Sequence, residues 1–144
     1  MALSNIKLTL HENPAAEEAE RLNTEFWAFV KSGLPDLPPE SDDTNFLLSA
    51  YVDEKYVGGL KANAYWDGLE IEVLWVNESY RNQGLGRQLM VQAEDYARKK
   101  GSVIAFLKTV EAVAFYESLG YEVYGILEDR PIGTVLYHMK KRLA

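Results

Sequence analysis

No cysteine occurs in the chain, which excludes disulfide bonds, a thiol nucleophile and zinc sites built on thiolates. Only two histidines are present, His11 and His138, so a histidine-based metal centre also lacks ligands. Apolar runs are a few residues long, far short of the roughly 20 residues that cross a bilayer. The first ten residues lack the basic start and the apolar block of a signal peptide. We therefore expect a soluble cytoplasmic protein with no metal and no membrane partner.

Positive charge is scarce as well. The chain has 15 lysines and arginines against 22 acidic residues, a net charge of −7. Basic residues cluster only at 98–100 and 140–142, each at the end of an expected element. Nucleic-acid binders need a basic stripe to neutralise phosphates, so we expect no nucleic-acid partner. The acidic surplus instead favours a cationic small-molecule substrate.

Length and hydrophobic periodicity predict the organisation of the chain. A length of 144 residues suits a single domain, residues 1–144, with one core. Strands are expected where apolar residues alternate or form short runs, and helices where they recur every three or four positions. The expected strands are 6–10, 46–52, 56–65, 69–76, 103–107, 123–127 and 134–139. The expected helices run from Pro14, after an Asn13 cap, to Gly33, from Leu85 to Gly101 and from Ala112 to Gly120. This order predicts an α/β fold of the α+β type, a mixed sheet flanked by helices.

Two connecting segments carry further expectations. Asp67-Gly68 is a tight-turn signal between two strands. Residues 35–43 contain three prolines and are expected to form a loop. Its carboxylates either attract a cationic amine or form a solvated acidic loop that only aids solubility. They are Asp36, Glu40, Asp42 and Asp43.

The most informative segment is residues 81–86, Arg-Asn-Gln-Gly-Leu-Gly, between an expected strand and an expected helix. Free N–H groups and the dipole at a helix start suit a pyrophosphate, and glycines let it approach the backbone closely. Arg81 and Arg87 could add charge-assisted contacts. A Walker loop would need lysine and then serine or threonine after the second glycine, and a dinucleotide fingerprint would need a glycine at Leu89. Because both are absent, a nucleotide-dependent, kinase-like protein is disfavoured.

The hexapeptide fits the pattern Arg or Gln, two residues, Gly, one residue, Gly or Ala of the GCN5-related N-acetyltransferases, the GNAT family. Residues 74–80 resemble the end of the family's fourth strand. Residues 112–121 resemble the family's helix that carries a tyrosine followed by Leu-Gly-Phe. The chain thus resembles a small bacterial-type GNAT protein. The resemblance implies a central, mostly antiparallel sheet of about seven strands flanked by helices.

The resemblance also implies a function. It indicates an N-acetyltransferase that moves an acetyl group from acetyl-CoA, its co-substrate, to a primary amine of a small molecule or peptide. The transfer would be a direct attack in a ternary complex. Thr109 stands where the family often has asparagine, so this contact departs from the pattern. The coenzyme contacts implied are Leu74, Trp75, Val76, Arg81, Asn82, Gln83, Gly84, Leu85, Gly86, Arg87, Thr109 and Tyr116.

Three residues are candidates for catalysis. An alkyl amine titrates near pH 10, so an acceptor must lose a proton before it attacks. Glu70 and Glu72 lie two apart on one expected strand and hence on one face, and either could be the general base. The sequence does not decide between them, and both could be solvated strand residues. Tyr116 is the candidate proton donor, because a phenol near pKa 10 matches a thiolate leaving group; its alternative role is packing.

Other functions remain open at this stage. One is a non-catalytic module that binds or senses acyl-CoA. Another is transfer of a longer acyl group, or transfer to an alcohol. The resemblance is compatible with a homodimer through the last strands. The sequence does not identify the acceptor.

Overall fold

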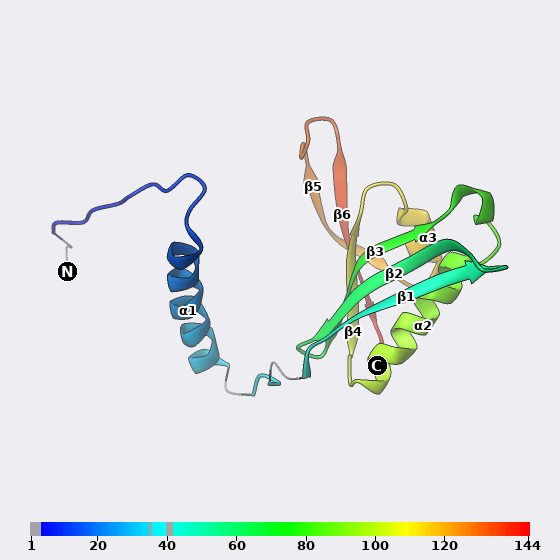
Figure 1. Ribbon diagram of the computed structural model, residues 1–144, viewed down its shortest axis with the longest axis horizontal. Coiled ribbons are helices and arrows are strands. Elements are labelled where there is room, and N and C mark those ends of the chain that lie inside the picture. The colour runs from blue at the N-terminus through cyan, green and yellow to red at the C-terminus, as the bar shows by residue number, and fades with distance from the viewer. Residues whose placement is uncertain (1–3, 35, 40–41) are drawn as a thin grey trace. The chain divides into compact units, whose positions relative to one another are not determined.

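The computed structural model describes residues 4–34, 36–39 and 42–144. The chain divides into two compact units, residues 1–37 and 38–144. Figure 1 shows both units.

The first unit contains one helix, α1, Ala16–Gly33. The helix ends at Gly33 as predicted, but it begins two residues after Pro14. Its N-cap is Ala15, which makes no side-chain hydrogen bond, and Asn13 instead adopts a left-handed φ of 50°. The predicted Asn13 cap is therefore wrong. Glu17 and Glu18 in the first turn complement the helix dipole without a cap.

The strand predicted at residues 6–10 does not form. These residues are irregular, and Leu8 is 90% exposed. A strand is stable only when its backbone groups pair with a neighbour. The described residues of this unit, 4–34 and 36–37, contain no second strand. Alternation of polar and apolar residues therefore misled the prediction here.

The second unit is built on a six-stranded sheet with the order β1-β2-β3-β4-β6-β5. Every neighbouring pair is antiparallel except β3 and β4, which are parallel. The mixed, mostly antiparallel sheet flanked by helices is thus confirmed, with six strands among the described residues. The strands are β1 Thr44–Val52, β2 Lys55–Tyr65, β3 Gly68–Val76, β4 Ile104–Thr109, β5 Glu122–Glu128 and β6 Val135–Arg142. The helices are a short 3-10 turn, η2 Glu78–Tyr80, followed by α2 Leu85–Lys99 and α3 Val113–Ser118.

The turn between β2 and β3 lies one residue earlier than predicted. Tyr65 pairs with Gly68, so the loop contains only Trp66 and Asp67. Both adopt left-handed φ values, 49° and 59°, as a two-residue hairpin turn requires. Gly68 is already part of β3.

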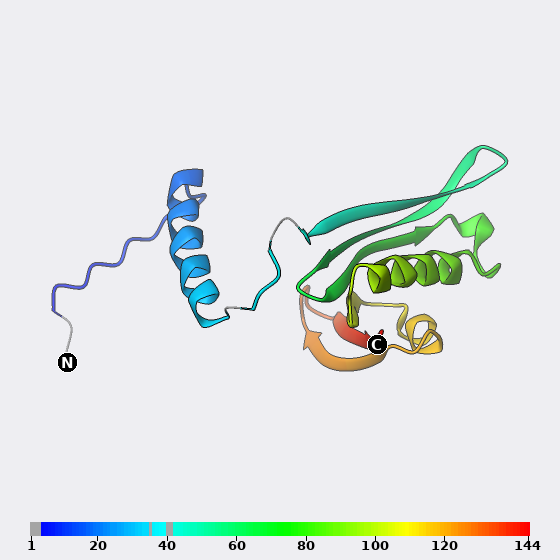
Figure 2. The same ribbon diagram turned by 90° about the horizontal axis from the view of Figure 1, so that it is seen from below.

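The hydrophobic core lies between the sheet and α2, which runs along the sheet in Figure 2. Apolar residues on α2 recur at spacings of three or four, so one side of the helix packs on the strands. Burial of these side chains supplies the main stabilisation of the unit. The core includes Leu60, Leu69, Ala105 and Met139 from the strands and Leu89, Met90, Ala93 and Ala97 from α2.

A buried carboxylate ties α2 to the end of the chain. Glu94, 3% exposed, accepts a hydrogen bond of 2.8 Å from the Tyr121 hydroxyl and forms an ion pair of 2.7 Å with Lys141. Burial, followed by the charge of Glu94, raises the pKa of Tyr121 well above its usual value. The Tyr121 ring contacts Tyr116 at a centroid distance of 5.9 Å. This network therefore helps to fix α3 relative to α2.

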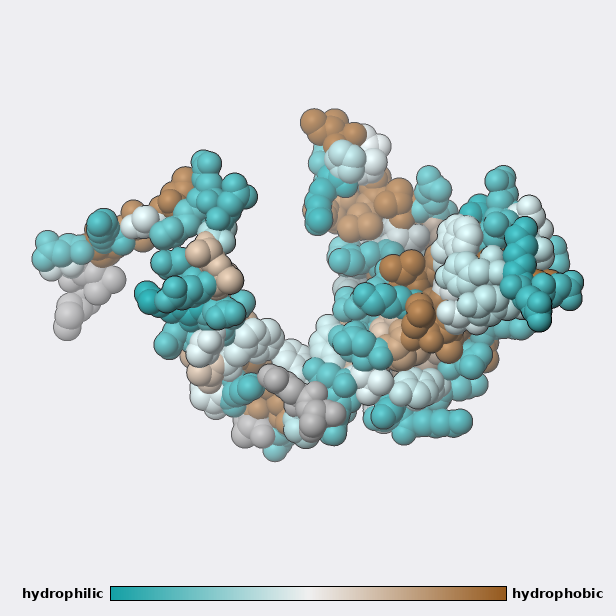
Figure 3. All heavy atoms as spheres, in the orientation of Figure 1, coloured by the Kyte–Doolittle hydropathy of each residue, from teal (hydrophilic) through white to brown (hydrophobic). Residues whose placement is uncertain are grey.

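The surface of this unit mixes both kinds of residue on the face that Figure 3 shows. Brown hydrophobic side chains form separate groups between teal hydrophilic ones. Ile132, in the connection between β5 and β6, is 91% exposed. Scattered apolar side chains of this kind are normal on protein surfaces.

The feature that positions the site is the separation of β3 from β4. The two strands pair only over Gly68–Glu70 and Ile104–Phe106. Beyond that point β3 continues to Val76 and β4 to Thr109 without pairing to each other. Figure 1 shows β4, β5 and β6 diverging from β1, β2 and β3. The sheet is thus open between β3 and β4 beyond Glu70 and Phe106.

Candidate active site

The loop between β3 and α2 presents unpaired backbone N–H groups. Asn82 and Gly84 have left-handed φ values of 62° and 85°, which turn the chain into α2. The N-cap is Gly84, which has no side chain to cap the helix, and no acidic residue lies in the first turn. The first helical bond runs from Gln88 N–H to the Gly84 carbonyl, 3.0 Å. The N–H groups of residues 85–87 therefore find no acceptor in the described part of the chain, which is the chemistry of an anion site.

Two arginines flank this loop. Arg81 Nε donates a hydrogen bond of 2.9 Å to the carbonyl of Val76, so the side chain is anchored to the end of β3. Arg87 reaches the Ser118 carbonyl of α3 at 3.5 Å. Both guanidinium groups are exposed and have further N–H donors available. They can reinforce the positive potential of the helix start.

Gly86 has a packing role that the sequence did not reveal. A Cβ atom added at Gly86 would lie 3.2 Å from the ring of Phe115. The ring of Phe115 in turn contacts Tyr116 at a centroid distance of 5.0 Å. The absence of a side chain at Gly86 thus lets α2 and α3 approach closely.

Tyr116 lies in α3 with a buried ring, 8% exposed. Burial raises the pKa of its phenol, so the hydroxyl keeps its proton at neutral pH. Within residues 42–144 no hydrogen bond holds this hydroxyl. Thr109, in contrast, has a local partner: its hydroxyl accepts a hydrogen bond of 3.1 Å from the Ala112 N–H at the start of α3. This bond gives Thr109 a structural role beside the coenzyme contact expected of it.

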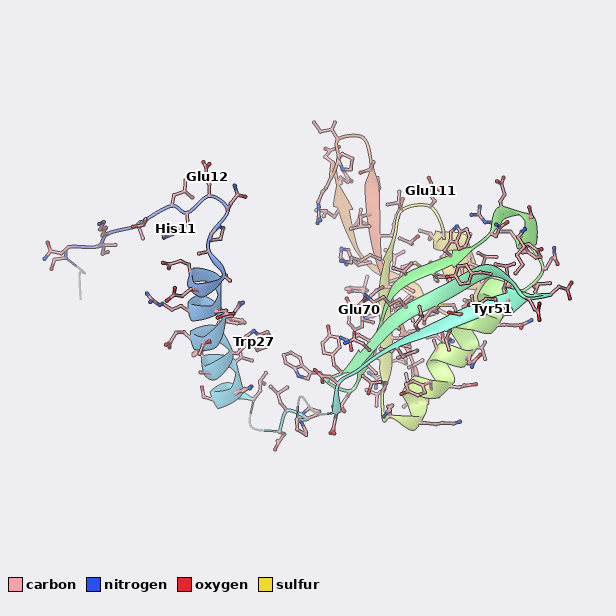
Figure 4. The ribbon with its side chains drawn as sticks, viewed as in Figure 1. His11, Glu12, Trp27, Tyr51, Glu70 and Glu111 are labelled. Carbon is pink, nitrogen blue, oxygen red and sulfur yellow. The ribbon has the colours of Figure 1, made fainter. Side chains whose placement is uncertain are left out.

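The two candidate bases line one pocket but differ in their partners. A bulge places Val73 opposite Lys61 and Ile71 opposite Ala62, so Glu72 is the extra residue of β3. Glu72 Oε2 lies 3.2 Å from the ammonium of Lys61. Glu70 lies at the last position where β3 pairs with β4 and is labelled in Figure 4. No cation in the described ranges forms an ion pair with it.

The pocket has a volume of about 330 Å³, within the range of small-molecule sites. It occupies the split in the sheet, because β3 supplies one wall while β4, β5 and β6 supply the other. Tyr116 is not among its lining residues. The structure therefore brings Glu70 and Glu72 together, and Tyr116 stands near the loop at the start of α2. The lining residues are Glu70, Ile71, Glu72, Phe106, Leu107, Lys108, Tyr124 and His138.

Tyr65 is a site residue that sequence reasoning missed. Burial raises the pKa of its phenol, and the negative charge of the nearby Glu70 raises it further. Asp43 and Glu72 add smaller contributions of the same sign, so three carboxylates surround this tyrosine. The available signal was the hairpin register, which places Tyr65 two residues beyond the partner of Glu70 on β2.

The structure describes residues 36–39, 42 and 43 of the acidic loop at 35–43. Asp42 and Asp43 line a second pocket together with Tyr65. Asp36 belongs to the first unit, and Glu40 lies outside the described residues.

Asn63, opposite Glu70 on β2, has a buried Oδ1 atom with no hydrogen-bond partner in the part of the chain described.

Residues 4–34, 36–39 and 42–144 contain no group of three or more His, Asp or Glu side chains that could hold a metal ion. None of their helices is both long and apolar enough to cross a membrane.

Comparisons with known proteins agree with this arrangement. The Acetyltransferase (GNAT) family pattern matches residues 5–121. An acetyltransferase of Agrobacterium fabrum is 31% identical over 106 residues, covering 72% of this chain and 77% of that protein. Blasticidin-S acetyltransferase of Streptomyces morookaense is 33% identical over 89 residues, covering 60% of this chain. The chain spans 65% of the length of that enzyme.

A solved structure shows the same fold. The crystal structure of an acetyltransferase from Bacillus cereus has a TM-score of 0.83 and 32% identity, and the match covers 93% of this chain and 97% of that one. The family match includes β3, the loop that precedes α2, and α3 with Tyr116. The chain belongs to the GNAT family of acetyltransferases.

Proposed function

We propose that this chain transfers an acetyl group from acetyl-CoA to a primary amine of a small molecule or peptide, by direct attack in a ternary complex. The observation that carries the proposal is the layout of β3. Its first half supplies Glu70 and Glu72 to the pocket, and its last residue, Val76, leads through η2 to the unpaired N–H groups at the start of α2. One strand thus connects an acceptor site to an anion site.

The coenzyme contacts follow from this layout. The N–H groups of Leu85, Gly86 and Arg87 would bind the pyrophosphate, with Arg81 nearby. Asn82, Gln83 and Gly84 shape the loop. Successive N–H groups of a strand alternate in direction, and the bond from Asn77 N–H to the Val57 carbonyl places the Trp75 N–H on the β2 side as well. The N–H groups of Leu74 and Val76, on the strand edge left open by the split, would polarise the thioester carbonyl. The coenzyme supplies the activated acetyl group.

Glu70 is the proposed general base. Its carboxylate lines the pocket and has no ion-pair partner in the described ranges, whereas Glu72 is already paired with Lys61. Glu70 would take a proton from the substrate ammonium, directly or through water, and the free amine would attack the carbonyl carbon. Tyr116 would give its proton to the departing thiolate, and the raised pKa keeps that proton available.

The amine of the acceptor is proposed to approach in its protonated form. The carboxylates of Asp43, Glu70 and Glu72 all raise the pKa of Tyr65, so negative charge is concentrated near this residue. Such a concentration favours a positively charged amine. Blasticidin-S acetyltransferase, by its name, acts on a small molecule. We also propose that residues 1–144 form one functional domain, because the family match, residues 5–121, extends over both units.

The pyrophosphate site is tested with a pair of variants at one position. Gly86→Ala introduces only the Cβ contact with Phe115, whereas Gly86→Asp adds a negative charge at the helix start. We expect Gly86→Asp to bind coenzyme A at least about 100-fold more weakly than Gly86→Ala, because the carboxylate repels the pyrophosphate. Isothermal titration calorimetry measures both affinities. Equal affinities in the two variants would remove the pyrophosphate from this loop.

Tyr116→Phe tests the proton donor. We expect turnover to fall about 10- to 1,000-fold, because the thiolate would leave without its proton donor. Affinity for coenzyme A should change little, since the ring and its contacts with Phe115 and Tyr121 are retained. The measurement is CoA release beside a binding titration. A variant that turns over at the wild-type rate would leave Tyr116 with packing alone.

Glu70→Gln and Glu72→Gln separate the two candidate bases. We expect Glu70→Gln to lower kcat/KM about 100-fold or more near neutral pH and Glu72→Gln to lower it less than about 10-fold. The defect of Glu70→Gln should shrink towards pH 10, because the acceptor then loses its proton without help. The pH profiles of kcat/KM measure this. A larger, pH-dependent defect in Glu72→Gln would assign the base to Glu72.

A further inference from the structure

Charges of both signs line the pocket without neutralising each other. Glu70 and Glu72 lie on the β3 wall, and Lys108 and His138 lie on the opposite wall. Within residues 42–144, neither Lys108 nor His138 forms an ion pair or a side-chain hydrogen bond. The two walls are thus chemically distinct.

Strand pairing places Lys108 and His138 side by side. They are direct partners on the antiparallel strands β4 and β6, so their side chains lie on the same face of the sheet. The Tyr124 ring packs edge-on against the imidazole at a centroid distance of 6.0 Å. This contact orients His138 beside the Lys108 ammonium. Together they form a donor pair suited to an oxyanion.

The split in the sheet explains why the walls stay apart. Glu70 and Phe106 are the last paired residues of β3 and β4, and Glu72 and Lys108 lie beyond them on the diverging strands. Glu72 pairs instead with Lys61 of β2, on the side away from β4. A ligand that spans the pocket can therefore meet a carboxylate at one end and a cation at the other.

We propose that the acceptor is a small amino-carboxylate, such as an amino acid, whose amine faces Glu70 and whose carboxylate binds Lys108 with His138. This inference rests on the proposed acetyl transfer and names its substrate class. A simple diamine fits the pocket less well, because its second ammonium would lie beside Lys108 and like charges repel. An acceptor with an uncharged end would lack the charge-assisted contact that a carboxylate makes with the Lys108 ammonium.

The test uses matched acceptors that differ only at the carboxylate. Wild-type protein, Lys108→Met and Lys99→Met are assayed for CoA release with the common amino acids, their carboxamides and a series of diamines. Lys99, in the last turn of α2, does not line the pocket and controls for loss of one positive charge. His138→Gln is a second variant of the proposed donor pair.

For the best amino acid, we expect the wild-type KM to be about 10- to 100-fold lower than that of its carboxamide. Lys108→Met should reduce this preference to a few-fold by raising KM for the amino acid alone, and His138→Gln should reduce it partially. Lys99→Met should keep the full preference, and KM for acetyl-CoA should stay the same throughout. Equal use of acids and carboxamides by the wild type, or a full preference in Lys108→Met, would overturn the inference.

A binding titration separates this inference from the proposed function. Calorimetry measures the affinity of the amino acid and its carboxamide for protein saturated with coenzyme A. Carboxylate-dependent binding that is lost in Lys108→Met, without CoA release from acetyl-CoA, would support the acceptor class and contradict acetyl transfer. CoA release with amines that shows no dependence on a carboxylate would support acetyl transfer and contradict the acceptor class. Absence of both binding and release with every amine would contradict both.

Discussion

The parting of β3 and β4 is the constraint on which the rest of the site depends. Parallel pairing stops after Glu70 and Phe106, so the facing edges of both strands lose their hydrogen-bonding neighbour. Backbone polar groups need partners, and an open edge beside a pocket offers them to a ligand. The same split separates the carboxylates of β3 from Lys108 and His138. The contacts proposed for the coenzyme's acetyl group and for the acceptor therefore lie along the same gap in the sheet.

Packing of α2 on the strands fixes the position of the loop before α2 relative to this gap. The apolar side of α2 is buried on the strands, and Glu94 binds Tyr121 and Lys141 beneath it. The Lys141 side chain is 23% exposed, so breaking this pair costs less than the roughly 3–5 kcal/mol of a fully buried one. The two contacts of Glu94 fix the second half of α2. Gly86 then allows Phe115, and with it Tyr116, to approach the loop. The candidate acid thus depends on a glycine in another helix.

Much of this arrangement could be predicted from local sequence signals. The strands of the second unit, the helix after Gly84 and the role of glycines at helix ends all follow from periodicity and backbone freedom. The strand expected at residues 6–10 failed, because alternation cannot supply a pairing partner. The bulge at Glu72 and the pairing of Lys108 with His138 depend on the register between paired strands, which periodicity along one segment does not determine. Tyr65 was missed for the same reason, since its link to Glu70 arises only across the hairpin.

The central claim is that the open edge of β3 and the loop before α2 together form the coenzyme site. Amide hydrogen exchange with and without acetyl-CoA tests this claim most directly, because both segments have N–H groups without partners among residues 42–144. We predict slower exchange at Leu74, Val76 and residues 84–87 when the coenzyme is bound, with little change in β1. Unchanged exchange in both segments at saturating coenzyme, or protection confined to other parts of the chain, would contradict it.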